Sequence, residues 1–300
     1  MSSRPPRSMH GKTCLVTGAT NGHGLAVAQR LARLGADLVL LARNPDKARR
    51  VAEALRLEAP GRRRPSVILA DLSRQEDVAD AAAAFLGERP ERPLHLLVNN
   101  AGMVSLRREE TAEGRERVLA VNYLALAHLT RRLLPRLKAT GSPTAPARVV
   151  NVSSDMHRMV RLDLGNLELR RGYSWWRSYA QSKLAIVYFT RELARRLGPP
   201  APAGTATVIV NAVDPGPVRS GIASSAPAPI ARATDELMRL FPPAARAART
   251  ALWLATAPEA GRLTGQYARF GRLHHPRVPD EPRIAKQLWS WTSEQIGALE

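Results

Sequence analysis

The sequence has little cysteine, no long apolar run and few aromatic side chains, and each shortage excludes a class of protein. Its one cysteine, Cys14, excludes a disulfide scaffold and any metal site built from several cysteines. The apolar runs are strand-sized, well short of the roughly 18 residues that a membrane-spanning helix needs. The N-terminus also lacks the apolar core of a secretory signal. From these absences we expect a cytoplasmic globular protein without a membrane anchor.

Charge is the unusual feature of the composition. Lysine and arginine total 45 against 26 aspartates and glutamates, a formal net charge of +19. A surface this basic attracts nucleic acid or an anionic membrane. However, the arginines are scattered along the chain, and nucleic-acid grooves interleave cations with aromatic residues, which make up only 5% here. We therefore interpret the charge as compositional and expect no nucleic-acid partner. The histidines show no metal-ligand spacing, so no metal is expected either.

Short β-rich runs alternate with amphipathic helical segments between residues 11 and 270. This alternation predicts an α/β fold: a single doubly wound Rossmann domain with a seven-stranded parallel sheet. The expected strands are Thr13–Val16, Asp37–Leu41, Val67–Ala70, Leu94–Val98, Arg148–Val152, Ala206–Val210 and Gln266–Ala268. We expect residues 1–10 to form a flexible N-terminal arm, 217–245 a substrate-loop region, and 271–300 a C-terminal helical extension of the same domain.

A glycine-rich loop, Thr17-Gly18-Ala19-Thr20-Asn21-Gly22-His23-Gly24, follows the first expected strand and opens into a helix. Glycines let the backbone turn tightly and approach a pyrophosphate, which then lies at the positive end of the helix. The pattern therefore predicts a dinucleotide site. The residues expected to contact the cofactor here are Gly18, Thr20, Asn21, Gly22, His23, Gly24 and Leu25.

The end of the second strand indicates which dinucleotide is bound. An NAD site usually carries a carboxylate about 20 residues beyond the glycines, where it binds the ribose 2′-hydroxyl. This chain has Arg43 and Asn44 there instead, and Lys47 follows. A guanidinium pairs with a 2′-phosphate, so NADP(H) is favoured over NAD(H).

Two further strand ends add residues to the expected cofactor site. Asp71 and Leu72 follow the third strand, where the carboxylate would lie beside the adenine amino group. Asn99, Ala101 and Gly102 belong to a tight turn after the fourth strand. Ligands of open parallel sheets lie beyond the carboxyl ends of the strands, which is where both segments begin.

Tyr179 and Lys183 are spaced i, i+4, on one face of an expected helix. The ammonium favours the phenolate, so we expect it to lower the pKa of the tyrosine toward the working range. Such a tyrosine donates a proton to a carbonyl oxygen as hydride arrives, or removes one in reverse. Ser154, at the end of the fifth strand, offers a hydroxyl to the same substrate oxygen.

With these motifs in this order, the chain closely resembles the short-chain dehydrogenase/reductase family over about residues 11–270. The segments that carry the resemblance are the TGATNGHG loop, Asp71-Leu72, Asn99-Asn100-Ala101-Gly102, Asn122, Ser154, Tyr179 with Lys183, and Asp214-Pro215-Gly216. The resemblance implies that Tyr179 is the general acid and base and that Lys183 also holds the nicotinamide ribose. It implies that Ser154 orients the carbonyl and that Asn122 anchors a water behind Lys183.

The resemblance also implies contacts after the sixth strand and an oligomer. The implied cofactor contacts there are Pro215, Gly216, Val218 and Ser220. Members of the family commonly associate through their long helices, so a homodimer or homotetramer is expected. Two residues depart from the family's pattern. His23 stands where an aliphatic residue is usual, and Asp214 replaces the common histidine or asparagine before Pro-Gly.

Finer features resemble one branch, the retinol dehydrogenase-like and protochlorophyllide reductase-like enzymes. They are the 25-residue gap from Ser154 to Tyr179, the segment Thr264-Gly-Gln-Tyr267 and the C-terminal segment around Trp289 and Trp291. This branch tends to use NADP(H) and large apolar substrates.

The resulting expectation is an NADPH-dependent oxidoreductase that reduces the carbonyl of a bulky apolar or aromatic ketone or aldehyde and oxidises the alcohol in reverse. A polyketide-type ketoreductase of secondary metabolite biosynthesis is one form of it. Two alternatives stay open: reduction of an activated double bond, and a cofactor-dependent regulator or nucleic-acid-binding protein that uses the basic surface. The intact set of Asn122, Ser154, Tyr179 and Lys183 favours the enzyme.

Overall fold

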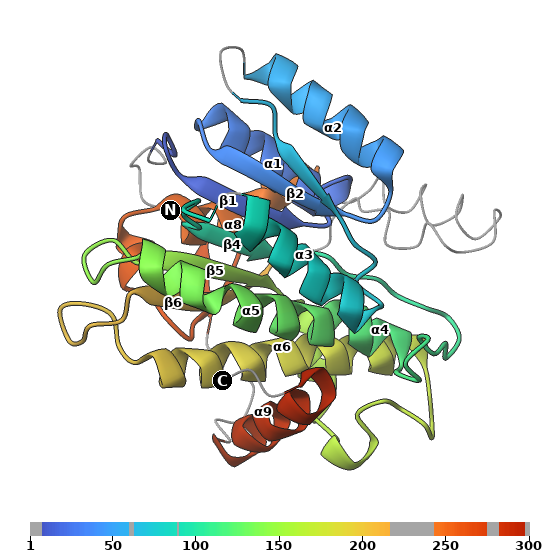
Figure 1. The fold of residues 1–300 in the computed structure, drawn as a ribbon. Helices are drawn as coiled ribbons and strands as arrows, with labels where there is room; N and C mark the ends of the chain where they lie inside the picture. Colours follow the sequence, from blue (N-terminus) through green and yellow to red (C-terminus); the bar gives the residue numbers. More distant parts are fainter. Residues whose placement is uncertain (1–7, 60–62, 89, 217–242, 275–281, 298–300) are drawn as a thin grey trace.

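The computed structural model describes residues 8–59, 63–88, 90–216, 243–274 and 282–297. One sheet runs through the molecule with helices on both faces (Figure 1). Its strands are β1 (Thr13–Thr17), β2 (Asp37–Ala42), β3 (Ser66–Leu69), β4 (Leu96–Asn99), β5 (Ala147–Val152), β6 (Val208–Asp214), β7 (Tyr267–Arg269) and β8 (Arg272–His274). Their order is β3-β2-β1-β4-β5-β6-β7-β8, so the sheet winds outward in both directions from β1 and β4.

The α/β Rossmann-type fold expected from the sequence is confirmed, with one difference in the sheet. The seven expected strands pair in parallel, and β8 adds an eighth, antiparallel strand. A two-residue turn makes this possible, because Phe270 and Gly271 both adopt positive φ, 49° and 72°, the backbone that hairpins require. The sixth strand also starts and ends later than expected and reaches Asp214.

Two layers of helices bury the two faces of the sheet. One layer is α1 (Gly22–Arg33), α2 (Pro45–Glu58) and α8 (Ala244–Thr256), whose apolar side chains share a core with β1 and β2. The other contains α3 (Gln75–Glu88), α5 (Ala125–Thr140), α6 (Trp175–Leu197) and α9 (Pro282–Ile296). Short turns complete the fold: α4 (Arg117–Leu119), η1 (Ala120–Leu124), η2 (Asp155–Met159), η3 (Leu164–Asn166) and η5 (Glu259–Arg262).

The two ends of the described chain are attached to this domain. Of the arm expected over residues 1–10, Met9 is buried and its N–H donates to Leu34 O at 2.8 Å, so the arm is packed at this point. At the other end, α9 lies along α6 (Figure 1), where Trp289 stacks on Phe189 with ring centroids 5.5 Å apart. The guanidinium of Arg196 lies over the Trp289 ring, 4.3 Å from its centroid.

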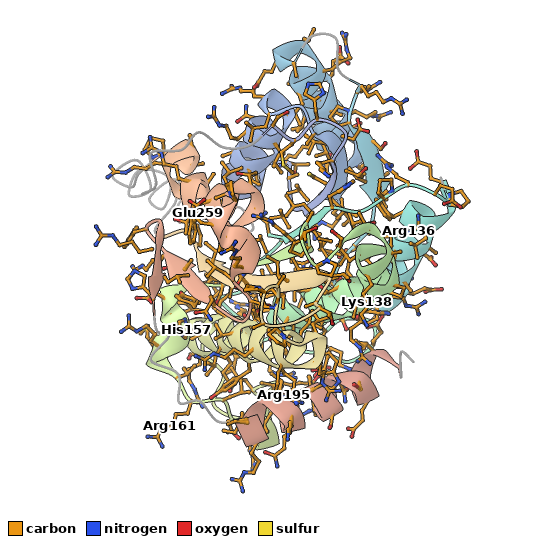
Figure 2. All side chains as sticks on the ribbon, turned by 90° about the vertical axis from the view of Figure 1, so that its left-hand side faces the viewer. Arg136, Lys138, His157, Arg161, Arg195 and Glu259 are labelled. Carbon is orange, nitrogen blue, oxygen red and sulfur yellow. The ribbon has the colours of Figure 1, made fainter. Side chains whose placement is uncertain are left out.

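Basic side chains are spread over the molecule in Figure 2, where Arg161 projects from the lower left edge and Arg195 lies in the lower centre. Many are neutralised locally, as in the pairs of Arg195 and Arg196 with Glu192 at 2.7 and 2.8 Å. The scatter seen along the sequence is thus also a scatter in space in this view. No helix in the described ranges is long and apolar enough to cross a bilayer.

Four histidines are held in surroundings that oppose protonation. Burial lowers the pKa of His95 and of His128 to about 4, and it also lowers the pKa of His23 and of His157. The geometry agrees, because His95 Nδ1 accepts a hydrogen bond from Thr13 N at 3.1 Å and therefore acts as a neutral acceptor. The unfolded chain takes up these protons near pH 6.5, whereas the folded chain does so only at lower pH.

Stability is therefore expected to fall as the pH drops from about 6.5 toward 4, because the unfolded state then binds more protons than the folded state. Each histidine that is protonated in the unfolded state but not in the folded state adds up to about 1.4 kcal/mol per pH unit to the slope of the free energy of unfolding against pH. Urea unfolding at several pH values measures the slope. His128→Gln should flatten it, whereas His274→Gln, in the exposed strand β8, serves as the matched control. A slope that is the same in all three proteins would contradict the assignment.

Candidate active site

The candidate site lies where β1, β4, β5 and β6 end, along the carboxyl edge of the sheet. The parallel pairing of these strands brings the glycine loop, the turn after β4, the serine after β5 and the turn after β6 to one edge. The expected site residues that belong to these segments are thus brought together by the topology alone.

The glycine loop is compact because two of its glycines leave no room for a side chain. A Cβ on Gly24 would lie 2.3 Å from Asn100 Nδ2 and 2.5 Å from Gly18 O. Gly18 has a φ of +64°, and a Cβ there would lie 2.9 Å from Ala101 Cα. The loop and the turn after β4 therefore pack backbone against backbone.

The first turn of α1 is suited to an anion. Its N-cap residue, Asn21, makes no side-chain capping hydrogen bond, and no acidic residue lies in the first turn. Backbone N–H groups at such a terminus, with the positive end of the helix dipole, favour a phosphate. The loop residues around this turn (Thr20, Asn21, Gly22 and Leu25) are at least partly exposed, as a cofactor contact requires.

Asn100 holds this loop in place, and the sequence-based set of site residues missed it. Its Nδ2 donates to Thr17 O at 2.9 Å and to Gly18 O at 3.2 Å. The hydroxyl of Thr17 accepts the N–H groups of Asn100 and Ala101 at 2.9 and 3.0 Å. The sequence does carry a signal for this residue, because Asn100 belongs to the Asn99-Asn100-Ala101-Gly102 motif.

His23 supports the loop from the inside. Its imidazole is 6% exposed, and Nδ1 lies 2.8 Å from Asn100 Oδ1. Because both protons of the Asn100 amide are directed at carbonyls, Oδ1 is the acceptor and Nδ1 the donor. The side chain is thus turned toward Asn100 and supports the loop, and the expected contact of His23 with the cofactor stays a prediction.

Asn99 also differs from its expected role. Its side chain is 2% exposed, and Nδ2 donates to Thr130 Oγ1 at 2.8 Å and to Asn151 Oδ1 at 2.9 Å. These contacts lie inside the sheet, so Asn99 joins β4 to α5 and β5. Successive residues of a strand point to opposite faces, which is why Asn99 points inward while Asn100 reaches the loop. Leu72 and Ala101 line a small cavity nearby.

The end of β2 presents a charge to the end of β3. Arg43 is exposed, and its charge helps to hold the pKa of Asp71 below its usual range. Burial, the largest single influence, acts to raise that pKa, but two hydrogen bonds from Ser73 and the charges of Arg43 and Arg117 together outweigh it. Asn44 caps α2 by accepting the N–H of Lys47 at 2.8 Å. The predicted 2′-phosphate contacts therefore lie together at one edge position.

Tyr179 and Lys183 lie one turn apart on α6, and Lys183 Nζ is 5.4 Å from the centroid of the tyrosine ring. Nζ also donates to Val152 O at 2.9 Å, which fixes the ammonium beside the end of β5. Burial lowers the pKa of Lys183 to about 8, while the charge of Asp214 acts to raise it.

The pKa of Tyr179 differs from the sequence-based expectation. Burial raises it to about 12, whereas the sequence predicted a lowering by Lys183. A hydrogen bond with the Ser154 side chain lowers the pKa, and the charge of Asp214 raises it further. The physical reason for the difference is that removing the phenolate from water raises the pKa by more than the Ser154 side chain lowers it. The tyrosine is therefore held as a proton donor.

Ser154 begins η2, where its side chain accepts the N–H of Met156 at 3.4 Å. The preceding residue, Ser153, donates to Lys183 O at 2.9 Å and so ties the end of β5 to α6. The Ser154 side chain is close enough to Tyr179 to lower its pKa, and the expected joint action of the two hydroxyls stays a prediction.

Asn122 lies in η1, a π-helical turn at Ala120–Leu124, a feature that is frequent at functional sites. Its amide accepts Met103 N at 2.7 Å and donates to Met103 O and to Ser182 Oγ, both at 3.0 Å. A Cβ on Gly102 would lie 3.4 Å from both Asn122 Oδ1 and Lys183 Nζ, so these three residues converge. The side chain fastens the loop after β4 to α6, and the water-anchoring role stays a prediction.

The turn after β6 contains Pro215 and Gly216, and Gly216 has a φ of +74°. Val218 and Ser220 lie outside the described residues, as does the expected substrate-loop region up to residue 242. The expected catalytic residues all lie in the described part of the chain: Asn122 on η1, Ser154 just after β5, and Tyr179 and Lys183 on α6.

The comparisons agree with this geometry. The family model described as short chain dehydrogenase matches residues 12–230. Human polyprenol dehydrogenase is 33% identical over 302 residues, covering 99% of this chain and 88% of that protein. Human retinol dehydrogenase 12 is 36% identical over 297 residues, covering 96% and 87%. A short-chain dehydrogenase from Shigella flexneri, solved in complex with NADP, has a TM-score of 0.67 and 26% identity, covering 89% of this chain and 100% of that one. The chain is thus a member of the short-chain dehydrogenase family of oxidoreductases and is similar to its retinol dehydrogenases.

Proposed function

We propose that this protein is an NADPH-dependent reductase of bulky apolar or aromatic ketones or aldehydes, which oxidises the corresponding alcohol in reverse. The observation that carries the proposal is that Lys183 Nζ lies 5.4 Å from the centroid of the Tyr179 ring, with the Ser154 side chain close enough to lower the pKa of that tyrosine. The two hydroxyls offer two donors to one substrate oxygen, which is the requirement for polarising and protonating a carbonyl.

The residues of the chain fit NADP(H). The uncapped start of α1 and the close-packed glycine loop suit a pyrophosphate. Exposed Arg43 suits a 2′-phosphate, and a similar solved structure contains NADP. When bound, NADPH supplies the hydride that reduces the carbonyl carbon.

The chain's own groups handle the proton. Tyr179, held protonated by burial, donates its proton to the carbonyl oxygen as the carbon is reduced. Ser154 orients that oxygen, and it also donates a hydrogen bond as negative charge develops there. Lys183, fixed by Val152 O, stabilises the phenolate that remains.

Exposed apolar side chains support an apolar substrate. Leu106, Met159, Trp175 and Phe270 are 45–61% exposed, and they lie in segments that follow β4, β5 and β7 or begin α6. Such residues near one sheet edge suit a bulky apolar molecule. The names of two relatives refer to retinol and a polyprenol, which agrees. A polyketide-type ketone is the finer form of the proposal.

The experiment is a fluorescence titration with NADPH and NADH, followed by NADPH oxidation against aromatic ketones, polycyclic polyketide-type ketones and retinal-type aldehydes. Tight NADPH binding with turnover of at least one carbonyl class is the expected result. NADPH oxidation with enones alone, giving the saturated ketone, would replace carbonyl reduction by double-bond reduction. Binding of neither nucleotide would overturn the proposal.

A further inference from the structure

Asp214, one of the two departures from the family's pattern, ends β6 with a side chain that is 4% exposed. Its Oδ1 accepts the N–H of Gly216 at 2.9 Å. Gly216 belongs to the turn after β6, and Asp155 directly follows Ser154. Through Arg269, which also binds Asp155, this buried carboxylate joins the turn after β6 to the loop that carries the site's serine.

Arg269, the last residue of β7, supplies the counter-charge. Its Nε lies 2.8 Å from Asp214 Oδ2, and its Nη1 donates to Asp155 Oδ2 at 2.8 Å. A guanidinium has planar, divergent donors, so one side chain can bind two carboxylates at once. Arg269 thus connects β7 to the same two segments that Asp214 connects.

Phe270 extends this arrangement to the turn after β6. Its ring lies under the Arg269 guanidinium, 4.4 Å from centroid to Cζ. A Cβ on Gly216 would lie 3.0 Å from the Phe270 ring, so the ring packs against the turn. The hairpin of β7 and β8 therefore contacts the turn after β6 through both its charge and its aromatic ring.

The charge of Asp214 reaches the proton donor and its lysine. This charge raises the pKa of two side chains on α6, those of Tyr179 and Lys183. Burial raises the pKa of Asp214 itself, and the Gly216 N–H and the charge of Arg269 oppose that rise. The pair is thus placed to act on the position and on the protonation of the site.

Few other titratable groups face this cluster within the described residues. Arg158, on η2, pairs with Asp155 at 3.3 Å. His157 and Tyr267 pack edge to face, with ring centroids 4.9 Å apart. Burial is the main cause that raises the pKa of Tyr267, and the charges of Asp214 and Asp155 raise it further.

We propose that Asp214 and Arg269 form a positioning pair for carbonyl reduction, which holds the Ser154 loop and the Pro215-Gly216 turn in fixed relation and keeps a negative charge beside Tyr179 and Lys183. The inference rests on the proposed function. Neither residue touches the reacting atoms, so both act through Ser154, Tyr179 and the turn.

The first test is Asp214→Asn, which keeps an acceptor for the N–H of Gly216 but removes the charge. Reduction needs protonated Tyr179, so activity declines as the pH rises through the tyrosine's pKa. Without the negative charge that pKa falls, and the alkaline limb of kcat/KM is expected to move down by about one pH unit. A purely structural role would lower activity or stability without moving the limb, and that result would overturn the electrostatic part.

The second test is Arg269→Met with Arg158→Met as the matched control. Both remove a guanidinium bound to Asp155, but only Arg269 also reaches Asp214. Arg269→Met is expected to lower kcat between about 10- and 100-fold, since small displacements of reacting groups cost that much. It should also weaken NADPH binding several-fold, whereas Arg158→Met stays near the wild type. Combining Asp214→Asn with Arg269→Met removes the uncompensated buried charge and should recover part of kcat.

The outcomes separate this inference from the proposed function. Arg269→Met that matches Arg158→Met in kcat and NADPH affinity overturns the pair while leaving the reductase intact. If the wild type binds NADPH but reduces no carbonyl, the proposed function fails, and the NADPH affinities of the two arginine variants still decide whether the pair holds the turn. If Arg269→Met does not fold, the limb position in Asp214→Asn decides.

Discussion

Replacing Tyr179 with phenylalanine is expected to lower kcat by at least about 100-fold, the usual contribution of a positioned general acid. The affinity for NADPH should stay within about twofold of the wild type. The change removes one hydroxyl from a ring that α6 already holds between Ser154 and Lys183. Stopped-flow or steady-state NADPH oxidation gives kcat, and fluorescence titration gives the affinity.

The control for this variant is Tyr173→Phe. Tyr173 lies just before α6, and its hydroxyl donates to Ser105 O at 2.8 Å rather than facing Ser154. Its loss should change kcat by no more than a few-fold. If Tyr179→Phe retains wild-type kcat at saturating substrate, the proton must come from another group and the proposed mechanism is wrong.

Arg43→Asp is expected to reverse cofactor preference, with the ratio of kcat/KM for NADPH over NADH falling by at least about 100-fold. Charge-assisted hydrogen bonds to a phosphate contribute roughly 1.5–3 kcal/mol, and the new carboxylate repels that phosphate while offering an acceptor to a ribose hydroxyl. Arg43 is exposed just after the end of β2, so the substitution does not disturb the core. In the wild type its charge acts on Asp71.

Arg50→Asp is the matched control for that prediction. It makes the same change in net charge on an exposed position of α2, less than one turn beyond Lys47. Cofactor preference should be unchanged in it. Equal shifts in both variants would mean that the preference reflects the general basic surface, and an unchanged ratio in Arg43→Asp would place the 2′-phosphate elsewhere.

The parts of the site that the sequence predicted are those set by local spacing. The glycine loop, the i, i+4 relation of Tyr179 and Lys183, and the strand ends depend on neighbours in the chain and on the parallel topology. The roles of Asn99 and Asn100 required knowing which face each side chain points to, and the register of β4 decides that.

The parts that the sequence did not predict depend on contacts between distant segments. Tyr179 is partly buried because neighbouring elements pack around α6, and spacing along α6 carries no information on how much water reaches it. Likewise, the pairing of Asp214 with Arg269 depends on β6 and β7 lying side by side. The strand β8 follows a turn at Phe270-Gly271, a sequence that lacks the common hairpin signals.

The helix α9 has a consequence for how the molecule responds to dilution. Tyr123 and Phe189, on η1 and α6, meet Thr292 and Trp289 of the same chain. Oligomers of the family commonly form on their long helices, where burial depends on the concentration of a second copy. Here α9, which covers this face of α6, belongs to the same chain, so its local concentration does not fall on dilution. The apolar face of α6 is therefore protected in a single molecule as well as in a concentrated solution.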